Sequence, residues 1–250
     1  MITPKTTVRQ IVGRYPQTRC VFEKHGIDYC CGGKLALEAA AKQVQANLQT
    51  MIDDLDAALK VPPDERKPDE KDWYNAPVPE LVTHILEVHH KYMHTALPNV
   101  RQLVAKVLLI HGPKHGEVLQ PVARLYAALD SELTAHLEKE ERVLFPMILA
   151  NVAAASGKNP ATAEPNCRSV AGPIAQMQYE HEKAGAVLDE LRQVTTGYTL
   201  PPDACLTFTA LYEEIKRMEV DLHQHIHLEN NILFPKSVEM EKMIKKEAQT

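Results

Sequence analysis

The sequence predicts an all-α protein built mainly as an antiparallel four-helix bundle. Strand signals are missing throughout the chain, and four long apolar stripes with spacings of three and four residues follow residue 79. Segments containing Pro and Gly separate these stripes, as expected for turns between helices. With 250 residues, of which 44% are hydrophobic and 24% are charged, the chain is long enough to bury a substantial core.

Composition and charge exclude several classes of function. A net charge of −5 gives no basic face that could neutralise phosphates, so we expect no nucleic-acid partner. No apolar run approaches the roughly 20 residues of a membrane-spanning helix, so no membrane role is expected. The first residues, MITPKTTVRQIVGRYP, lack the apolar stretch of a signal peptide, which predicts a cytoplasmic protein. Histidine, with twelve copies, is the residue type that calls for explanation.

Residues 1–60 are expected to form a small helical module. Thr6 or Thr7 can cap a helix, Pro16 can open a second helix, and Gly26 can end it. A linker is predicted at residues 61–79, VPPDERKPDEKDWYNAPVP, which contain five of the seventeen prolines and a charge run. A further amphipathic helix is predicted by apolar residues at helical spacing, namely Leu48, Met51, Ile52, Leu55 and Leu59.

The bundle is expected to occupy residues 80–250, with one histidine on the buried face of each helix. Turns are expected at 111–116 (HGPKHG), 156–166 (SGKNPATAEPN) and 195–203 (TTGYTLPPD). The stripes are Val82, Leu86, His90, Met93, Leu97, Val100 and Val104; Val122, Leu125, Leu129, Glu132, His136, Glu140 and Val143; Ile174, Met177, His181, Ala184, Leu188 and Leu191; and Leu211, Ile215, Met218, Leu222, His225, Glu229 and Ile232.

An internal repeat links the second and fourth helices. HLEKEERVLFP at 136–146 and HIHLENNILFP at 225–235 share His, Glu, Leu, Phe and Pro at the same offsets, which indicates two related helical hairpins. Residues four apart project from one helical face, so each repeat offers an imidazole and a carboxylate to the same point.

Four imidazoles and two carboxylates suit first-row divalent metals. We expect two iron ions bridged by oxo and carboxylate groups, each held by two imidazoles and both carboxylates, with positions open for a small ligand. Ordinary core histidines bonded to core glutamates are the alternative, but their recurrence on four separate stripes favours metal. The predicted ligands are His90, His136, Glu140, His181, His225 and Glu229.

Helical phase separates the predicted ligands from neighbouring histidines. His223 and His227 lie about 200° around the helix from His225 and should face outward. His84 and His89 fall off their stripe for the same reason. His94 lies only about 40° from His90, which predicts a place at the rim of the site or in support of a ligand, rather than a ligand itself.

Two acidic residues and two cysteines are further candidates. Glu132 takes a core position one turn before His136, as a solvated glutamate at the core edge, a proton carrier or a partner that supports a ligand. Glu180, beside His181, is a weaker candidate for the same roles. Cys30 and Cys31, in DYCCGG, are adjacent and do not form part of a disulfide framework, since five cysteines is an odd number. They are candidates to bind a soft metal, accept nitrosyl or sulfur, or dock a partner, and a structural role is the alternative. A structural or incidental role is expected for the remaining cysteines, Cys20, Cys167 and Cys205.

The motifs GIDYCCGGKLALEAA, HLEKEERVLFP, YEHEKAG and HIHLENNILFP together make the chain resemble the repair-of-iron-centres (RIC) family. That family pairs a short ScdA-type N-terminal domain with a hemerythrin-like di-iron bundle. The resemblance implies the same six ligands, and it implies that Glu132 and Glu180 act in access or proton movement.

The resemblance also implies a function, namely repair of iron-sulfur clusters damaged by nitrosative or oxidative stress. Iron would be donated to the cluster, with Cys30 and Cys31 as a transient soft-ligand or docking station. The alternatives are a scavenger that binds or reduces nitric oxide and a sensor of oxygen or redox state. The expected partners are damaged iron-sulfur proteins, with nitric oxide or oxygen as a small ligand, and the sequence leaves open both a homodimer and whether the protein is an enzyme.

Overall fold

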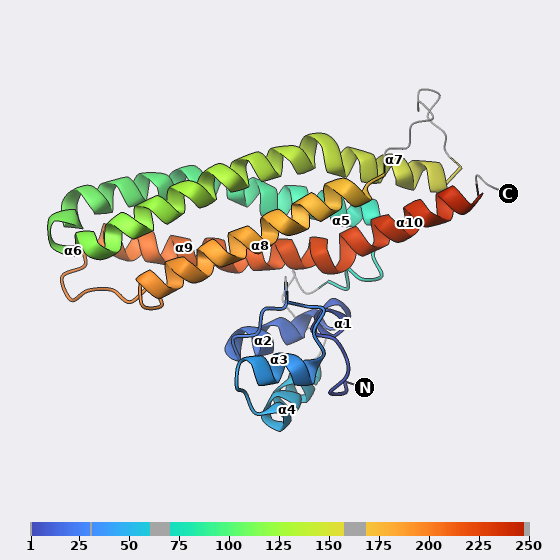
Figure 1. The fold of residues 1–250 in the computed structure, drawn as a ribbon, viewed down its shortest axis with the longest axis horizontal. Helices are drawn as coiled ribbons and strands as arrows, with labels where there is room; N and C mark the ends of the chain where they lie inside the picture. Colours follow the sequence, from blue (N-terminus) through green and yellow to red (C-terminus); the bar gives the residue numbers. More distant parts are fainter. Residues whose placement is uncertain (1, 31, 61–70, 158–168, 248–250) are drawn as a thin grey trace.

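The computed structural model describes residues 2–30, 32–60, 71–157 and 169–247, which form helices joined by turns (Figure 1). Within these ranges the one extended pairing is an isolated bridge between Thr7 and Ala36, so the predicted all-α class is confirmed. None of the described helices is both long enough and apolar enough to cross a membrane.

The N-terminal module folds as the sequence indicates. Thr7 is the N-cap of the first helix, and its backbone N–H donates to Oε1 of Gln10 over 3.1 Å. Gly26 has a φ of 67°, a left-handed conformation that glycine adopts without strain and that ends the second helix. Met51 and Leu55 are fully buried in the module's own apolar core. The elements are α1 (Val8–Arg14), the 3₁₀ turn η1 (Pro16–Thr18), α2 (Arg19–Lys24), α3 (Leu37–Gln43) and α4 (Leu48–Leu59).

Four antiparallel legs make up the predicted bundle, and the module lies against one side of it (Figure 1). The first leg comprises α5, η3 and the start of α6, and the second comprises the rest of α6, η4 and α7. Helix α8 is the third leg, and α9, η5 and α10 form the fourth. The elements are α5 (Val78–His84), η3 (Ile85–His90), α6 (Lys91–Lys139), η4 (Glu140–Leu144), α7 (Phe145–Ala155), α8 (Ala171–Val194), α9 (Leu206–Leu228), η5 (Glu229–Leu233) and α10 (Phe234–Glu247).

The corner between the first two legs is tighter than the sequence predicts. We expected a loop at 111–116, but α6 is helical there except at His115, whose φ of −121° and ψ of 24° mark the reversal. Lys114 and His115 reach the carboxylate of Asp203 over 2.6 and 3.0 Å. These contacts tie the corner to the α8–α9 connection, where the turn predicted at 195–203 is present. These contacts between distant parts of the sequence stabilise a tight turn where Gly and Pro had suggested a loop.

Part of the predicted linker belongs to the bundle. Residues 61–70 lie outside the described residues, as does most of the turn expected at 156–166. Trp73, in contrast, is buried, and its indole stacks on the imidazole of His84 with ring centroids 4.2 Å apart. Because α5 already begins at Val78, this stacking fixes the entry of the chain into the first leg.

Among the described residues, three π-helical turns interrupt the legs at predicted metal ligands. Turn η3 ends at His90, η4 begins at Glu140 and η5 begins at Glu229. A π turn closes its hydrogen bonds over one residue more than an α turn, so side chains beyond it are shifted around the helix. Val143, expected in the core, is therefore 50% exposed, whereas Leu144 is 2% exposed.

The expected core position of Glu132 is wrong. Glu132 is exposed, and the next residue, Leu133, is buried instead. Leu129, Leu133, His136 and Glu140 share the buried face at spacings of three and four residues. Glu132 lies about 100° from Leu133 around the helix, which places it beyond the edge of that face.

In the part of the bundle that the structure describes, two apolar clusters fill the interior, and a polar layer lies between them. Along α8, for example, Met177 belongs to one cluster and Ala184 to the other, with His181 between them. The N-terminal module docks beside this layer, where the side-chain amide of Asn231 in η5 donates to the carbonyl oxygen of Tyr29 over 3.0 Å. The two clusters thus enclose the polar layer along the bundle axis, and the module lies beside it.

The phase of the second leg can be tested by stability. We expect Leu129→Ala to lower the free energy of unfolding by about 2–5 kcal/mol, because it leaves a cavity in the core. Glu132→Ala, on the exposed face, should change this free energy by less than about 0.5 kcal/mol. Urea denaturation of both variants measures the difference. Comparable losses in the two variants would contradict the phase described here.

Candidate metal centre

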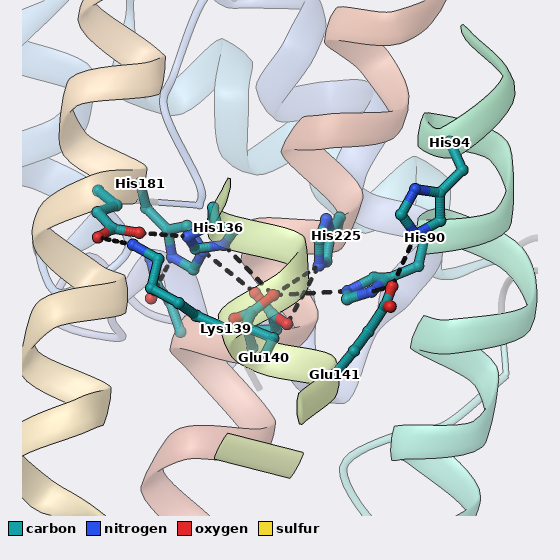
Figure 2. Close-up of polar contacts among 11 residues, drawn as sticks. His90, His94, His136, Lys139, Glu140, Glu141, His181 and His225 are labelled. Atoms are coloured by element: carbon teal, nitrogen blue, oxygen red, sulfur yellow. Dashed lines mark hydrogen bonds and ion pairs between the residues drawn. The ribbon is translucent and has the colours of Figure 1, made fainter. Parts of the chain in front are cut away.

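The buried polar layer contains all six predicted ligands, each at most 3% exposed. In Figure 2, the imidazoles of His136 and His181 lie on one side of Glu140, and those of His90 and His225 lie on the other. Two groups of four donors have ligand atoms within 4.8 Å of one another, namely His90, Glu140, His225 and Glu229, and His136, Glu140, His181 and Glu229. The two glutamates are common to both groups.

The carboxylate of Glu140 reaches imidazoles of both groups. Its Oε2 lies 3.5 Å from Nε2 of His90 and 3.3 Å from Nε2 of His136. Donor atoms bonded at right angles to one metal ion, with bonds of about 2.1 Å, lie about 3 Å apart. The separations around Glu140 are close to this value.

The carboxylate of Glu229 likewise contacts one imidazole of each group. Its Oε1 lies 3.1 Å from Nε2 of His225, and its Oε2 lies 3.1 Å from Nε2 of His181. The Nε2 atom of His181 is also 3.1 Å from Nε2 of His136. All four imidazoles thus direct Nε2 toward the carboxylates, which leaves Nδ1 to face outward.

Glu141 holds the imidazole of His90 from behind. Its Oε1 accepts hydrogen bonds from Nδ1 of His90 and from Nε2 of His94, each over 2.8 Å. His94 was predicted at the rim, and it is exposed and connected to the centre through Glu141 (Figure 2). A carboxylate in this position fixes the ring and raises its basicity as a ligand.

Glu180 holds His136 in the same manner. Its Oε2 accepts from Nδ1 of His136 over 2.9 Å, while Oε1 accepts from Lys139 and, over 2.9 Å, from Gln176. Burial opposes ionisation, but these donors lower the pKa of Glu180 to about 2. Glu180 therefore supports a predicted ligand, whereas Glu132 makes no described contact with the layer.

Asn230 supports His181 and completes a pattern that the internal repeat could have predicted. Its Oδ1 accepts from Nδ1 of His181 over 3.0 Å. In the repeat, Asn230 follows Glu229 as Glu141 follows Glu140. Each repeat thus supplies, one residue after its glutamate, an acceptor for a histidine of a neighbouring leg. Neither acceptor was predicted from the helical phase of the sequence.

The imidazole of His225 is positioned differently. Its Nδ1 has no hydrogen-bond partner among the described residues, and the ring stacks on His89 with centroids 5.7 Å apart and planes 5° apart. His89 was expected off the buried face, but it is 3% exposed, and its Nδ1 lies 3.0 Å from Oδ1 of Asp221. Packing, rather than a hydrogen bond, orients this fourth ring.

Both carboxylates of the layer stay ionised despite complete burial. Burial and mutual repulsion raise the pKa of Glu140, but the neighbouring imidazoles, His136 first, hold it below its usual value. Burial is likewise outweighed at Glu229, where His225 makes the largest contribution to a pKa well below the usual range. In turn the carboxylates outweigh burial at His136 and raise its pKa to about 9. Two buried negative charges require positive charge in direct contact.

Several atoms of the layer have no hydrogen-bond partner among the described residues. These atoms are both carboxylate oxygens of Glu140 and of Glu229, both ring nitrogens of His225, and Nε2 of His90. Protein interiors rarely leave so many buried polar atoms unpaired, and coordination to metal satisfies donors of this kind. The nitrogen and oxygen donors suit first-row ions such as iron. The layer therefore has the composition and geometry of a metal centre.

Comparison with known proteins agrees with this geometry. The model of the hemerythrin HHE cation binding domain matches residues 81–237, and that of ScdA_N, a domain of unknown function, matches residues 4–59. An iron-sulfur cluster repair protein YtfE from Cronobacter sakazakii is 37% identical over 91% of this chain and 93% of its own length. Proteins of the same name from Salmonella schwarzengrund and Escherichia coli are 35% and 33% identical, over 89% of this chain and 92% of theirs. The chain belongs to the RIC family.

In this RIC protein the module covers a histidine that was expected to be exposed. His227 points away from the metal layer, as its phase predicts, but it is only 3% exposed. The ring of Tyr29 meets it edge-on at 5.5 Å, and the amide of Asn231 donates to its Nδ1 over 2.9 Å. Burial lowers the pKa of His227 to about 3. The expectation of an exposed side chain is correct only for His223, which is partly exposed.

Cys30 lies at the boundary between module and bundle, and Cys31 lies outside the described residues. Cys30 is 5% exposed, packs with the apolar side chains of the bundle, and donates its thiol hydrogen to Oδ1 of Asp28 over 3.0 Å. A cavity of about 460 Å³ borders it, between the module and the bundle, with Glu182 and His223 also in the wall.

A second group of reactive side chains lies at the α6 corner. Cys205, expected to be structural or incidental, is exposed at the N-terminus of α9, and its Sγ is 3.1 Å from Nε2 of His111. This imidazole and the backbone N–H groups of Phe208 and Thr207 lower the pKa of the thiol to about 7. The HGPKHG segment thus holds the α8–α9 connection through Asp203 and places an imidazole against the thiol of Cys205.

The pKa of Cys205 predicts its chemical reactivity. Because the thiolate is the nucleophile, alkylation of Cys205 by iodoacetamide should reach half its maximal rate near pH 7. His111→Ala should move this midpoint upward, toward the ordinary value of about 8.5. Mass spectrometry of the Cys205 peptide gives the rate at each pH. His115→Ala is the control, since His115 bonds Asp203 and not the thiol; an equal shift in both variants would contradict the assignment.

Proposed function

We propose that the buried layer holds two iron ions, bridged by Glu140 and Glu229. His90 and His225 would bind one ion, and His136 and His181 the other, in line with the two donor groups. Such a centre supplies redox-active iron in a site otherwise closed by protein. Around it, Glu141, Glu180 and Asn230 hold three of the imidazoles in the tautomer that leaves Nε2 available.

The observation that carries this proposal is that each carboxylate reaches imidazoles of both groups. A glutamate that belonged to one metal only would contact one pair of histidines. Oε2 of Glu140 is instead within 3.5 Å of His90 and His136, and the two oxygens of Glu229 divide between His225 and His181. Carboxylates shared in this way are typical of dinuclear sites in helical bundles.

We further propose that the protein repairs iron-sulfur clusters damaged by nitrosative or oxidative stress, with iron as the material that it delivers. The relatives named iron-sulfur cluster repair proteins, aligned over about nine-tenths of this chain, support this proposal. The acceptors would be damaged iron-sulfur proteins in the cytoplasm, where thiols are kept reduced. Cys30 and Cys31 would take part in docking or in transient binding of the delivered ion, and Glu132 in access to the centre.

The proposed centre predicts the metal content of ligand variants. The protein loaded with ferrous iron should hold about two ions per chain, and His136→Ala or His225→Ala should lower this number. Glu140→Ala should disturb both ions together, because Glu140 is assigned as a bridge. Metal analysis and the near-ultraviolet absorption of the oxidised centre measure these effects.

His223→Gln is the control for these variants, because His223 lies two residues from His225 but faces away from the layer. It should keep both ions. If every single ligand variant also kept two ions, the proposed set would be wrong, and loss of one ion with the other unaltered in Glu140→Ala would contradict bridging.

Delivery can be separated from nitric oxide scavenging. Ferrous protein mixed with an apo iron-sulfur protein, sulfide and reductant should lose iron to it as the cluster re-forms. Cys30→Ser/Cys31→Ser should keep its bundle iron but transfer it more slowly. Retention of all the iron in the mixture, combined with turnover of nitric oxide in a parallel sample, would support the scavenger instead.

A further inference from the structure

Residues 230 and 231 of η5 lie between the metal layer and the N-terminal module. The Oδ1 atom of Asn230 accepts from Nδ1 of His181 over 3.0 Å, while its Nδ2 donates to the carbonyl oxygen of Cys30 over 3.4 Å. The neighbouring Asn231 donates to the carbonyl oxygen of Tyr29 over 3.0 Å. One side-chain amide therefore contacts both a ring of the centre and the loop that carries Cys30.

The amide group of Asn230 has a fixed orientation because its two ends differ. The oxygen can only accept, so Nδ1 of His181 must carry the proton, and Nε2 is left with a lone pair that points toward Glu229. The NH₂ end must then face the carbonyl of Cys30. Rotating the amide by 180° would lose both contacts, and moving the Cys30 loop away would remove one of the two constraints.

The equivalent residue in the other repeat has no such connection. Glu141 follows Glu140 as Asn230 follows Glu229, and it supports His90 as Asn230 supports His181. The described hydrogen bonds of Glu141 stay within the bundle, since its second donor is His94 on the same leg as His90. The two halves of the layer therefore differ in whether their supporting residue contacts the module.

The Cys30 loop is itself firmly docked. Cys30 is 5% exposed and packs with the bundle's apolar cluster, and Tyr29 is 2% exposed and lies against the ring of His227. Gly33 follows closely: a Cβ there would come within 2.9 Å of the carbonyl oxygen of Tyr29 and 3.0 Å of Oδ1 of Asn231. A side chain at residue 33 would thus require the loop at Tyr29 and the side chain of Asn231 in η5 to shift.

We propose that Asn230 is a positioning residue that transmits docking of the Cys30 loop to His181. Displacement of the loop then speeds release of the ion held by His136 and His181 and leaves the other ion unaffected. This inference rests on the proposed function and deepens it, because it names the half of the centre that delivers iron and the contact that controls delivery. Loss of such an outer partner typically weakens metal binding 10- to 100-fold.

The test follows release of iron from the full-length protein to an excess of a ferrous chelator. Asn230→Ala removes the link, and Gly33→Ala displaces the loop without touching the centre. Each should speed release of one of the two ions about 10-fold, and the variant carrying both changes should be no faster than Asn230→Ala alone. Glu141→Ala, the matched change in the other repeat, should speed the other ion, so that combining it with Asn230→Ala speeds both.

Gly13→Ala is the control for the glycine substitution, because a Cβ there meets only Tyr74 at an ordinary 3.6 Å. Asn231→Ala removes the hydrogen bonds of this amide to the carbonyl oxygens of Tyr29 and Cys30, and the one to His227, without adding an atom. It should therefore reproduce Gly33→Ala if the module stays folded. Far-ultraviolet circular dichroism checks the fold of each variant.

The outcomes separate this inference from the proposed function. If the unchanged protein does not hold two ions, the proposed function and this inference are both overturned. If it holds two ions but Gly33→Ala and Asn231→Ala release both at the original rates, the inference alone is overturned. The same follows if the effects of Asn230→Ala and Gly33→Ala multiply, because independent effects would show that the loop does not act through Asn230.

Discussion

The burial of Glu140 and Glu229 is the constraint on which the rest of this structure depends. Two ionised carboxylates without solvent exposure are costly unless positive charge lies in contact with them. In the proposed centre, metal ions held by one imidazole from each of the four legs meet this need, so the legs must align at a single level along the bundle. The apolar core is consequently divided into two clusters, one on each side of the polar layer.

The internal repeat explains both the symmetry of the layer and its departure from symmetry. Equivalent positions supply His136 with His225 and Glu140 with Glu229, which gives each half the same donors. The supporting residues have diverged. Glu180 comes directly before His181 and holds His136 by a hydrogen bond. The residue directly before His90 is His89, and it holds His225 by stacking. Two ions in these halves would experience different ligand basicity, although their ligand sets are alike.

The central residues of the site could be predicted from the sequence because a regular helix turns a spacing into a direction. His136 and Glu140 are four residues apart and therefore share a helical face, and the repeat places His225 and Glu229 at the same spacing. The apolar stripes placed the remaining histidines. The bundle and its four legs followed from the same periodicity.

The prediction failed where the periodicity changes or where another part of the chain intervenes. Val143 lies in a π turn, which a constant period of 3.6 residues does not describe. His227 was assigned to solvent because helical phase contains no information about the module that covers it. Glu141 and Asn230 depend on distances between legs, which one helix cannot reveal. Glu132 fell at the edge of a face, where a small error in phase decides between core and solvent.

The π turns restrict how the length of these helices can change. Phe145 and Phe234 follow η4 and η5, and their rings lie 5.5 and 6.0 Å from those of His90 and His181. Five residues of a π turn cover about the same angle as four residues of an α-helix, so deleting one residue from either turn would leave the phenylalanine near its present direction. A deletion between His136 and Glu140, where the helix is regular, would instead rotate the glutamate and every later residue by about 100° relative to the histidine. Within these two helices, the π turns are thus the places where a relative can lack one residue with the least change to the site, and alignments of relatives should place their gaps accordingly.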